Sequence, residues 1–246
     1  MKHRMAFLVS LLLLLSALFG GCAGGASHET STTAPVQQAL TVKMLDVGQG
    51  DGFLLECKGK VMSVDCGSSS NEHFGERVLE PFLLSKAVLT IDTALITHCD
   101  RDHLSGIEYL LSKSTQIRIR ELVLPAPAEE DPRYGILKRL AVRRGCRIRY
   151  LKNGDMLAFP SSLRCCYPEN NEPIEEANSH SIGMLLAYGN FRMLFTGDMP
   201  MAAEESMLTA LKKEGVNPLV FYSFVVPSIK RWIELIKPIS NSPTTP

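Results

Sequence analysis

Six consecutive residues in the middle of the chain combine two histidines with two aspartates. They read His98-Cys99-Asp100-Arg101-Asp102-His103 and follow a short apolar run from Thr93 to Thr97. Neutral imidazole nitrogens and carboxylate oxygens are the ligands that hydrolytic divalent-metal sites use. A solvated polar turn is the alternative interpretation. Four potential ligands in one loop, between a predicted strand and a predicted helix, favour a metal-binding role.

A further carboxylate follows a later apolar run. Leu194-Phe195-Thr196-Gly197-Asp198 has the form of a buried strand that ends in Gly-Asp. A carboxylate at that point could bridge two metal ions. Taken alone the signal is weak, because Gly-Asp also occurs in ordinary turns. In combination with the His98 to His103 stretch it indicates a second part of the same site.

Strands and helices alternate along the chain and must position these side chains. Period-two and short apolar runs predict strands, and spacing of three to four residues predicts helices. The strands are expected at residues 39–45, 52–57, 61–65, 93–97, 121–124, 146–151, 181–188 and 191–195, and the helices at 73–85, 104–111, 134–144 and 200–213. This mixture predicts an α/β fold in which helices cover sheets.

The charge of the chain is balanced overall and uneven locally. Twenty-six Lys and Arg residues match twenty-six Asp and Glu residues, so the net charge argues for no polyanionic partner. From Lys113 to Lys152, however, eleven basic residues face four acidic ones. Such a strip could bind the phosphate backbone of DNA. A solvated helix face is the equally weighted alternative.

The N-terminus is typical of an exported protein. Lys2 and Arg4 precede an apolar run from Met5 to Phe19, which is shorter than the roughly 20 residues of a membrane-spanning helix. The small residues before Cys22 resemble a bacterial lipobox, so Cys22 is predicted to be lipidated, with cleavage by ordinary signal peptidase as the alternative. We therefore expect a signal peptide at 1–22, a flexible tether at 23–39, a domain at 40–246, and anchoring to the outer face of the bacterial cell membrane.

Several motifs together resemble one family. Besides the two stretches above, these are Met44-Leu45-Asp46-Val47-Gly48-Gln49-Gly50-Asp51, Val64-Asp65-Cys66-Gly67 and Asn178-Ser179-His180-Ser181-Ile182. They occur in family order and resemble the metallo-β-lactamase superfamily, more narrowly the extracellular domain of ComEC competence proteins and their free-standing relatives. The resemblance covers about Leu40 to Leu211. It implies an αββα sandwich with a metal site at the edges of the sheets.

The resemblance also implies roles for individual residues. The metal ligands would be His98, Asp100, Asp102, His103 and His180, with Asp198 as the bridging carboxylate. One or two divalent ions, Zn²⁺ or Mn²⁺, would lower the pKa of water and make hydrolysis of a phosphodiester feasible. Asp100 or Asp51 could accept a proton, and Asp51 and Asp65 could also support the ligands through hydrogen bonds.

The chain departs from the family after Asp198. The family has a His-His-Gly-Ser stretch, where this chain reads Val220-Phe221-Tyr222-Ser223, and no histidine follows His180. A frameshift, a decaying gene and a natural altered relative are the competing explanations. We therefore expect a fold that is truncated or altered at its C-terminal end. The predicted function is an exported hydrolase with impaired activity, and the alternative is an inactive lipoprotein that binds a ligand or partner on the same scaffold.

Overall fold

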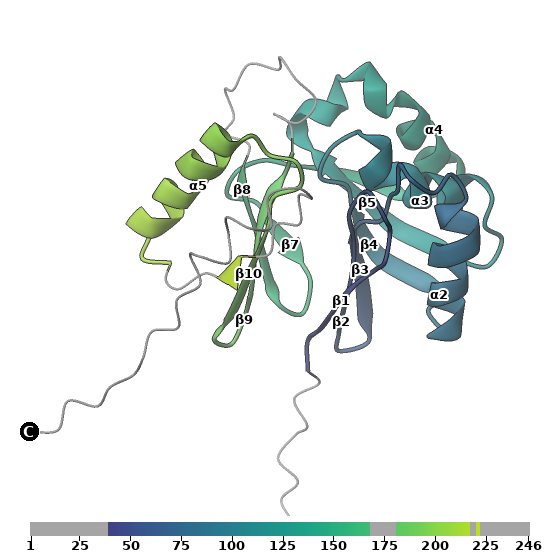
Figure 1. Ribbon diagram of the computed structural model, residues 1–246, viewed down its shortest axis with the longest axis horizontal. Helices are drawn as coiled ribbons and strands as arrows, with labels where there is room; N and C mark the ends of the chain where they lie inside the picture. Colours follow the sequence, from purple (N-terminus) through teal and green to yellow (C-terminus); the bar gives the residue numbers. More distant parts are fainter. Residues whose placement is uncertain (1–38, 168–180, 217–219, 222–246) are drawn as a thin grey trace, which may run out of the picture. The chain divides into compact units, whose positions relative to one another are not determined.

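The computed structural model describes residues 39–167, 181–216 and 220–221 of the chain (Figure 1). The chain divides into Met1–Gln37 and Gln38–Pro246, and all described residues lie in the second unit. None of the helices in these described ranges has the length and apolar character needed to cross a membrane.

The first sheet has six strands in sequential order. Its first three strands pair antiparallel, and β3 through β6 pair parallel. The strands are β1 (Thr41–Met44), β2 (Gly52–Cys57), β3 (Lys60–Asp65), β4 (Thr90–Leu95), β5 (Arg118–Pro125) and β6 (Arg147–Leu151). The strands predicted at residues 39–45 and 52–57 are confirmed and form the antiparallel β1–β2 pair. Because β3 and β4 are parallel, the residues that follow both strands meet at one edge of the sheet.

The second sheet has five strands in the order β11-β10-β9-β8-β7. All pairs are antiparallel except β10 with β11. The strands are β7 (Met156–Ala158), β8 (Ser162–Tyr167), β9 (Gly183–Tyr188), β10 (Phe191–Phe195) and β11 (Val220–Phe221). The sequence predicted β9 and β10 but missed β7 and β8, because β7 is only three residues long and β8 carries a pair of cysteines in place of typical strand residues.

The helices differ from the predicted ones mainly at their ends. The predicted helix over 73–85 is a π-helical turn followed by α2, and short 3₁₀ turns precede α4. The bounds are Gly75–Leu79 for the π-helical turn, Glu80–Ser85 for α2, Arg101–Ser112 for α3, Ala126–Glu129 and Pro132–Tyr134 for the 3₁₀ turns, Gly135–Arg143 for α4 and Met201–Lys213 for α5. The prediction for α3 was wrong at its start, since this helix begins three residues earlier than Leu104.

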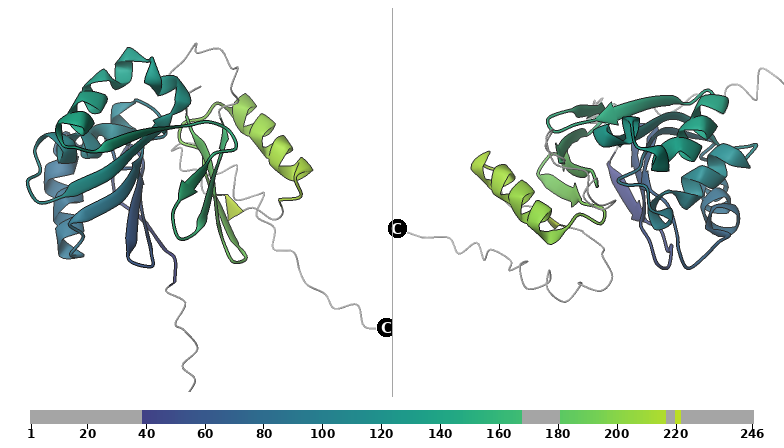
Figure 2. Two further views of the ribbon diagram at one scale, coloured as in Figure 1. Left: turned by 180° about the vertical axis from the view of Figure 1, so that it is seen from behind. Right: turned by 90° about the horizontal axis from the view of Figure 1, so that it is seen from above.

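Three apolar clusters separate four layers, and the predicted αββα sandwich is confirmed. One cluster fills the space between the sheets, where Phe53 of β2 and Phe195 of β10 make an edge-to-face ring contact at 5.3 Å. A second lies between the first sheet and helices α2, α3 and α4, and a third lies between the second sheet and α5. Figure 2 shows α5 and the other helices on the two outer sides. Burial of these clusters is the main stabilising contribution to the fold.

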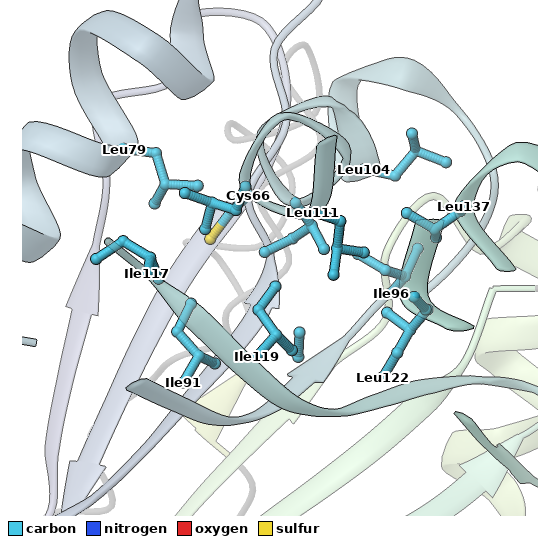
Figure 3. Packing of buried hydrophobic residues seen from close by; sticks show 14 of the residues in the cluster. Cys66, Leu79, Ile91, Ile96, Leu104, Leu111, Ile117, Ile119, Leu122 and Leu137 are labelled. Atoms are coloured by element: carbon cyan, nitrogen blue, oxygen red, sulfur yellow. The ribbon is translucent and has the colours of Figure 1, made fainter. Parts of the chain in front are cut away.

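The cluster under α3 fixes the helix that carries half of the candidate site. Leu104 and Leu111 of α3 belong to the same buried cluster as Ile96, which directly follows β4, and Ile119 of β5 (Figure 3). At Gly106 a Cβ atom would lie 2.3 Å from the carbonyl oxygen of Cys66, so only glycine permits this approach between α3 and the end of β3. The first turn of α3 is therefore held against the residues that follow β3.

Candidate metal centre

The two histidines of the His98 to His103 motif lie in different secondary structure, one in a connecting segment and the other in a helix. His98 lies in the segment between β4 and α3, whereas Asp102 and His103 lie in the first turn of α3. The prediction that all four motif residues lie in one loop is wrong for Asp102 and His103. The carbonyl oxygen of Asp100 accepts hydrogen bonds from the amides of His103 and Leu104, so the helix begins directly at the motif. The early start makes His103 more rigid than a loop would.

His98, His103 and Asp198 converge. Each offers one ligand atom, and these atoms all lie within 4.8 Å of one another. Asp198 Oδ1 is 3.4 Å from His103 Nε2, and Asp198 Oδ2 is 3.9 Å from His98 Nε2. The two imidazole rings are 4.0 Å apart at their centroids. Asp198, which lies shortly after the end of β10, is thus close to His98 and His103 of the motif after β4.

Asp65, the last residue of β3, stabilises this arrangement through hydrogen bonds that its carboxylate accepts. One of its oxygens accepts from the Thr97 amide at 2.7 Å, and the other accepts from the Thr97 hydroxyl at 2.9 Å and from His103 Nδ1 at 3.0 Å. Because a carboxylate only accepts, His103 Nδ1 carries a hydrogen and Nε2 faces Asp198. The Asp65 carboxylate lies where a supporting residue was expected. No role was predicted for Thr97, although this residue directly precedes His98.

Two glycines allow the chain segments to approach closely at the site. A Cβ atom on Gly67 would lie 2.5 Å from both the carbonyl carbon of Asp102 and the amide nitrogen of His103. A Cβ atom on Gly197 would lie 2.6 Å from the Thr97 hydroxyl, and the positive φ of Gly197 also favours glycine. These contacts set the distance from β3 to α3 and from β10 to β4. The Asp-x-Gly and Gly-Asp pairs of the sequence therefore have a steric function.

Asp51 lies beneath the motif. Its amide donates to the carbonyl oxygen of Asp102, and its carbonyl oxygen accepts from the amides of Cys66 and Gly67. A second buried group of possible metal ligands consists of the carboxylates of Asp51 and Asp65 and the imidazole of His103. Burial, and then the negative charge of Asp65, raise the pKa of Asp51 to about 7. A proton is thus retained within the acidic cluster near neutral pH.

The two histidines have opposite proton affinities. Burial and the neighbouring His103 lower the pKa of His98. Burial also opposes a charge on His103, but Asp65 and Asp198 outweigh it and raise the pKa of His103 to about 11. The hydrogen bond from His103 in turn lowers the pKa of Asp198. Without a bound metal, His103 and Asp198 therefore form an ion pair, and His98 is neutral.

The remaining predicted residues are placed as follows. Asp100 is half-exposed and its Oδ2 lies 3.6 Å from His98 Nε2, at the solvent side of the group. Asp102 is half-buried and close enough to Asp51 for its charge to raise the Asp51 pKa. The predicted ligand His180 and the predicted lipidation site Cys22 lie outside the described residues. The structure thus groups His98 with His103 and Asp198.

The donor set fits a divalent metal ion. Within the described part of the chain, His98 Nε2 is fully buried and has no hydrogen-bond partner. A buried ring nitrogen without a partner is costly, and a metal ion in reach of Asp198 and His103 would satisfy it. The second imidazole nitrogen of each histidine is engaged, His98 Nδ1 with the Thr97 hydroxyl and His103 Nδ1 with Asp65. Such outer partners are typical of metal-binding histidines.

Comparison with known families agrees with this geometry. The profile of the metallo-beta-lactamase superfamily matches residues 45–237. This chain belongs to the metallo-beta-lactamase superfamily. Membership supports a metal-dependent hydrolase. Among curated proteins, ComE operon protein 3 of Bacillus subtilis strain 168 is 29% identical to this superfamily member over 183 residues, which confirms the predicted ComEC-type resemblance. The match covers 68% of this chain and only 23% of that relative.

Three solved structures are similar to this chain at low identity. A diphosphatase from the PhnP family is 15% identical, with 63% of this chain and 56% of that chain covered at a TM-score of 0.41. YhfI from Bacillus subtilis, a metallo-beta-lactamase fold protein, is also 15% identical, with 64% and 61% covered at a TM-score of 0.43. CmlA, a diiron β-hydroxylase from Streptomyces venezuelae, is 17% identical, with 74% and 34% covered at a TM-score of 0.47.

Proposed function

We propose that this superfamily member is an exported, metal-dependent hydrolase of phosphodiesters. The observation that carries the proposal is the buried, unpartnered Nε2 of His98, which faces His103 and Asp198. A structural ion pair alone would not need a second, neutral histidine in the same place. A hydrolytic metal site does need neutral nitrogen and carboxylate oxygen directed at one point.

We assign the metal ligands to His98, His103 and Asp198, with Asp100 and Asp102 completing the set. A divalent ion held there would act as a Lewis acid and lower the pKa of water. The carboxylate-rich set favours Mn²⁺ more than an all-histidine set would, and Zn²⁺ remains the competing ion. His180 would be a further ligand. Asp65 keeps His103 in the tautomer that presents Nε2.

Asp100 is the better of the two proposed proton acceptors. Its side chain is 46% exposed and lies 3.6 Å from His98 Nε2, so a substrate at the site could reach it. Asp51 is only 8% exposed and binds the backbone of the α3 start. Asp51 therefore suits the role of a supporting residue that stores a proton beside His103.

The proposed substrate class comes from the ComEC-type resemblance and from charge. The match to ComE operon protein 3 extends over 183 residues. The basic residues of the Lys113 to Lys152 strip that lie outside α4 offer cations for a phosphate backbone. DNA is thus the first polymer to test. A small chromogenic phosphodiester would report on the chemistry without requiring the polymer.

The test compares two aspartate-to-asparagine variants of the full chain. Bound metal is measured by elemental analysis, and hydrolysis of bis-p-nitrophenyl phosphate and of DNA is measured with Mn²⁺ and with Zn²⁺. Asp198→Asn should lose activity by about 100-fold or more, because loss of a ligand costs at least as much as loss of an outer partner. Asp155→Asn removes a carboxylate from the turn before β7 and should behave as wild type. Equal activity of both variants would exclude the assigned site.

One observation favours the second candidate, a binding protein without turnover. The chain has no histidine after His180, so the His-His-Gly-Ser ligand of the family is missing. If that loss is decisive, the wild-type chain should bind one metal ion and hydrolyse nothing, and restoring His-His-Gly-Ser at residues 220–223 should produce activity. Two bound ions and full activity in the unchanged chain would exclude this candidate.

We also propose that Cys22 is the lipidated N-terminus of the mature protein on the outer face of the bacterial membrane. The apolar run that ends just before this cysteine supports the proposal. Intact-mass spectrometry of the protein from bacterial membranes should show a diacylglycerol adduct at Cys22, and Cys22→Ser should release the protein. A mature N-terminus beyond residue 22 without lipid would refute the proposal.

A further inference from the structure

Helix α4 presents an unusual outer face. Leu137 and Ala141 are buried against the rest of the domain, whereas Ile136 is 57% exposed and Val142 is 69% exposed. Arg139 and Arg143 are exposed as well. At 100° per residue, these four exposed side chains lie within an arc of about 120° on the helix surface. We call these four residues the α4 face.

The α4 face is both basic and apolar. Residues 132–154 contain eight Lys and Arg residues and no Asp or Glu. Three neighbouring arginines, Arg120, Arg133 and Arg147, each form an ion pair with an acidic side chain. Among the residues that the structure describes, neither Arg139 nor Arg143 has a carboxylate partner. A helix that mixes unpaired guanidinium groups with protruding aliphatic side chains is typical of segments that lie at a lipid interface.

The apolar residues decide between polyanionic partners. Phosphates of a nucleic acid backbone would pair with Arg139 and Arg143 but offer Ile136 and Val142 no apolar layer. An anionic bilayer offers both, since headgroup phosphates accept from guanidinium groups and the acyl boundary receives aliphatic side chains. Helix α4 itself lies on the side of the first sheet that faces away from the second sheet (Figure 1).

We propose that the α4 face docks onto an anionic phospholipid surface. The contact is separate from the lipid proposed at Cys22 and does not depend on the proposed hydrolase activity. It would hold the domain in one orientation on the membrane. A tether alone leaves the domain free to rotate.

The test measures the binding of full-length chain to two kinds of vesicle. One kind is pure phosphatidylcholine, and the other contains equal parts of phosphatidylcholine and phosphatidylglycerol. Each basic residue at an anionic surface is worth about fivefold in partitioning. Arg139→Gln with Arg143→Gln should therefore reduce binding to the anionic vesicles about 25-fold. The charge-matched control is Lys212→Gln with Lys213→Gln, at the exposed end of α5, and it should retain wild-type binding.

A second variant tests the apolar contribution. Ile136→Ser with Val142→Ser keeps every charge and should reduce vesicle binding about tenfold or more. Hydrogen exchange on the vesicles should slow over residues 135–144 in the wild type only, and thermal melting should be unchanged because the side chains are exposed. Equal binding to both vesicle types would overturn the proposal. So would duplex DNA binding that needs the arginines but not Ile136 and Val142, or a dimer in solution that the serine variant dissolves.

Discussion

The carboxylate of Asp65 accepts a hydrogen bond from His103 Nδ1 at 3.0 Å, which leaves His103 Nε2 facing Asp198 Oδ1 at 3.4 Å. This relationship joins the end of β3 to the first turn of α3. It also fixes which nitrogen of His103 is available as a ligand.

Asp65→Asn should weaken metal binding about 10- to 100-fold. The asparagine can still accept from the Thr97 amide, but its NH₂ group then faces His103 Nδ1. A metal at His103 Nε2 leaves the one remaining hydrogen on Nδ1, and that hydrogen then faces the NH₂ group without an acceptor, so the metal-bound state is destabilised. Competition with a fluorescent chelator measures the affinity, and Asp155→Asn is the control. An unchanged affinity would show that Asp65 does not set the tautomer.

Metal affinity should increase as the pH rises. Asp65 and Asp198 keep His103 protonated in the metal-free chain, with a pKa of about 11 despite burial. A metal at Nε2 must displace that proton, so binding releases about one proton and affinity rises about tenfold per pH unit below this pKa. Calorimetry in buffers with different ionisation enthalpies measures the proton count. Binding without proton release would contradict the ion pair described here.

Gly67→Ala should both destabilise the fold and disturb the site. The added methyl group would lie 2.5 Å from backbone atoms of Asp102 and His103, which cannot rotate away. Overpacking of this kind costs about 1–3 kcal/mol, and more when backbone is involved. Gly135→Ala is the control, because the only atom within 4 Å is the far end of the Arg139 side chain at 3.3 Å. Chemical denaturation and metal titration of both variants give the comparison.

Asp92→Asn should destabilise the chain at neutral pH and less at acid pH. Asp92 accepts from the Val61 amide, Lys60 and Arg120, which ties β4 to β3 and β5. Partial burial opposes the charge, but these donors hold the Asp92 pKa below its usual range. A depressed pKa gives stability that is present above the unfolded pKa of about 4 and is lost as the pH falls through the folded pKa.

We expect a loss of about 1 kcal/mol at pH 7 for Asp92→Asn, from denaturation by urea. The difference from wild type should shrink below pH 4, where the wild-type carboxyl also becomes neutral. Asp155→Asn is again the control, because it makes the same aspartate-to-asparagine change at another position. A difference that stays constant with pH would mean that the amide fails for steric reasons and that the charge of Asp92 contributes nothing.

Motifs along the sequence were sufficient to predict the family and the layer architecture, and they named the residues that the structure brings together. Motif spacing was sufficient because the superfamily motifs occur in order along the chain, each except the Asn178 to Ile182 stretch at the end of an apolar run that forms a strand. His98, His103 and Asp198 were all named from these runs. Period-two and helical patterns were sufficient for eight of the eleven described strands and for the helices, whose burial follows local periodicity.

Patterns along the sequence could not predict the contacts between segments that are far apart in the chain. The sequence showed Asp65, Thr97, His103 and Asp198 as separate residues. Only the parallel pairing of β3 with β4, and the packing of the two sheets, brought their side chains within hydrogen-bond distance. The grouping of His98 with His103, and the burial that leaves His98 Nε2 without a partner, likewise depend on contacts between residues far apart in sequence. Local patterns carry no information on such contacts, because register and layer packing are decided by the whole core.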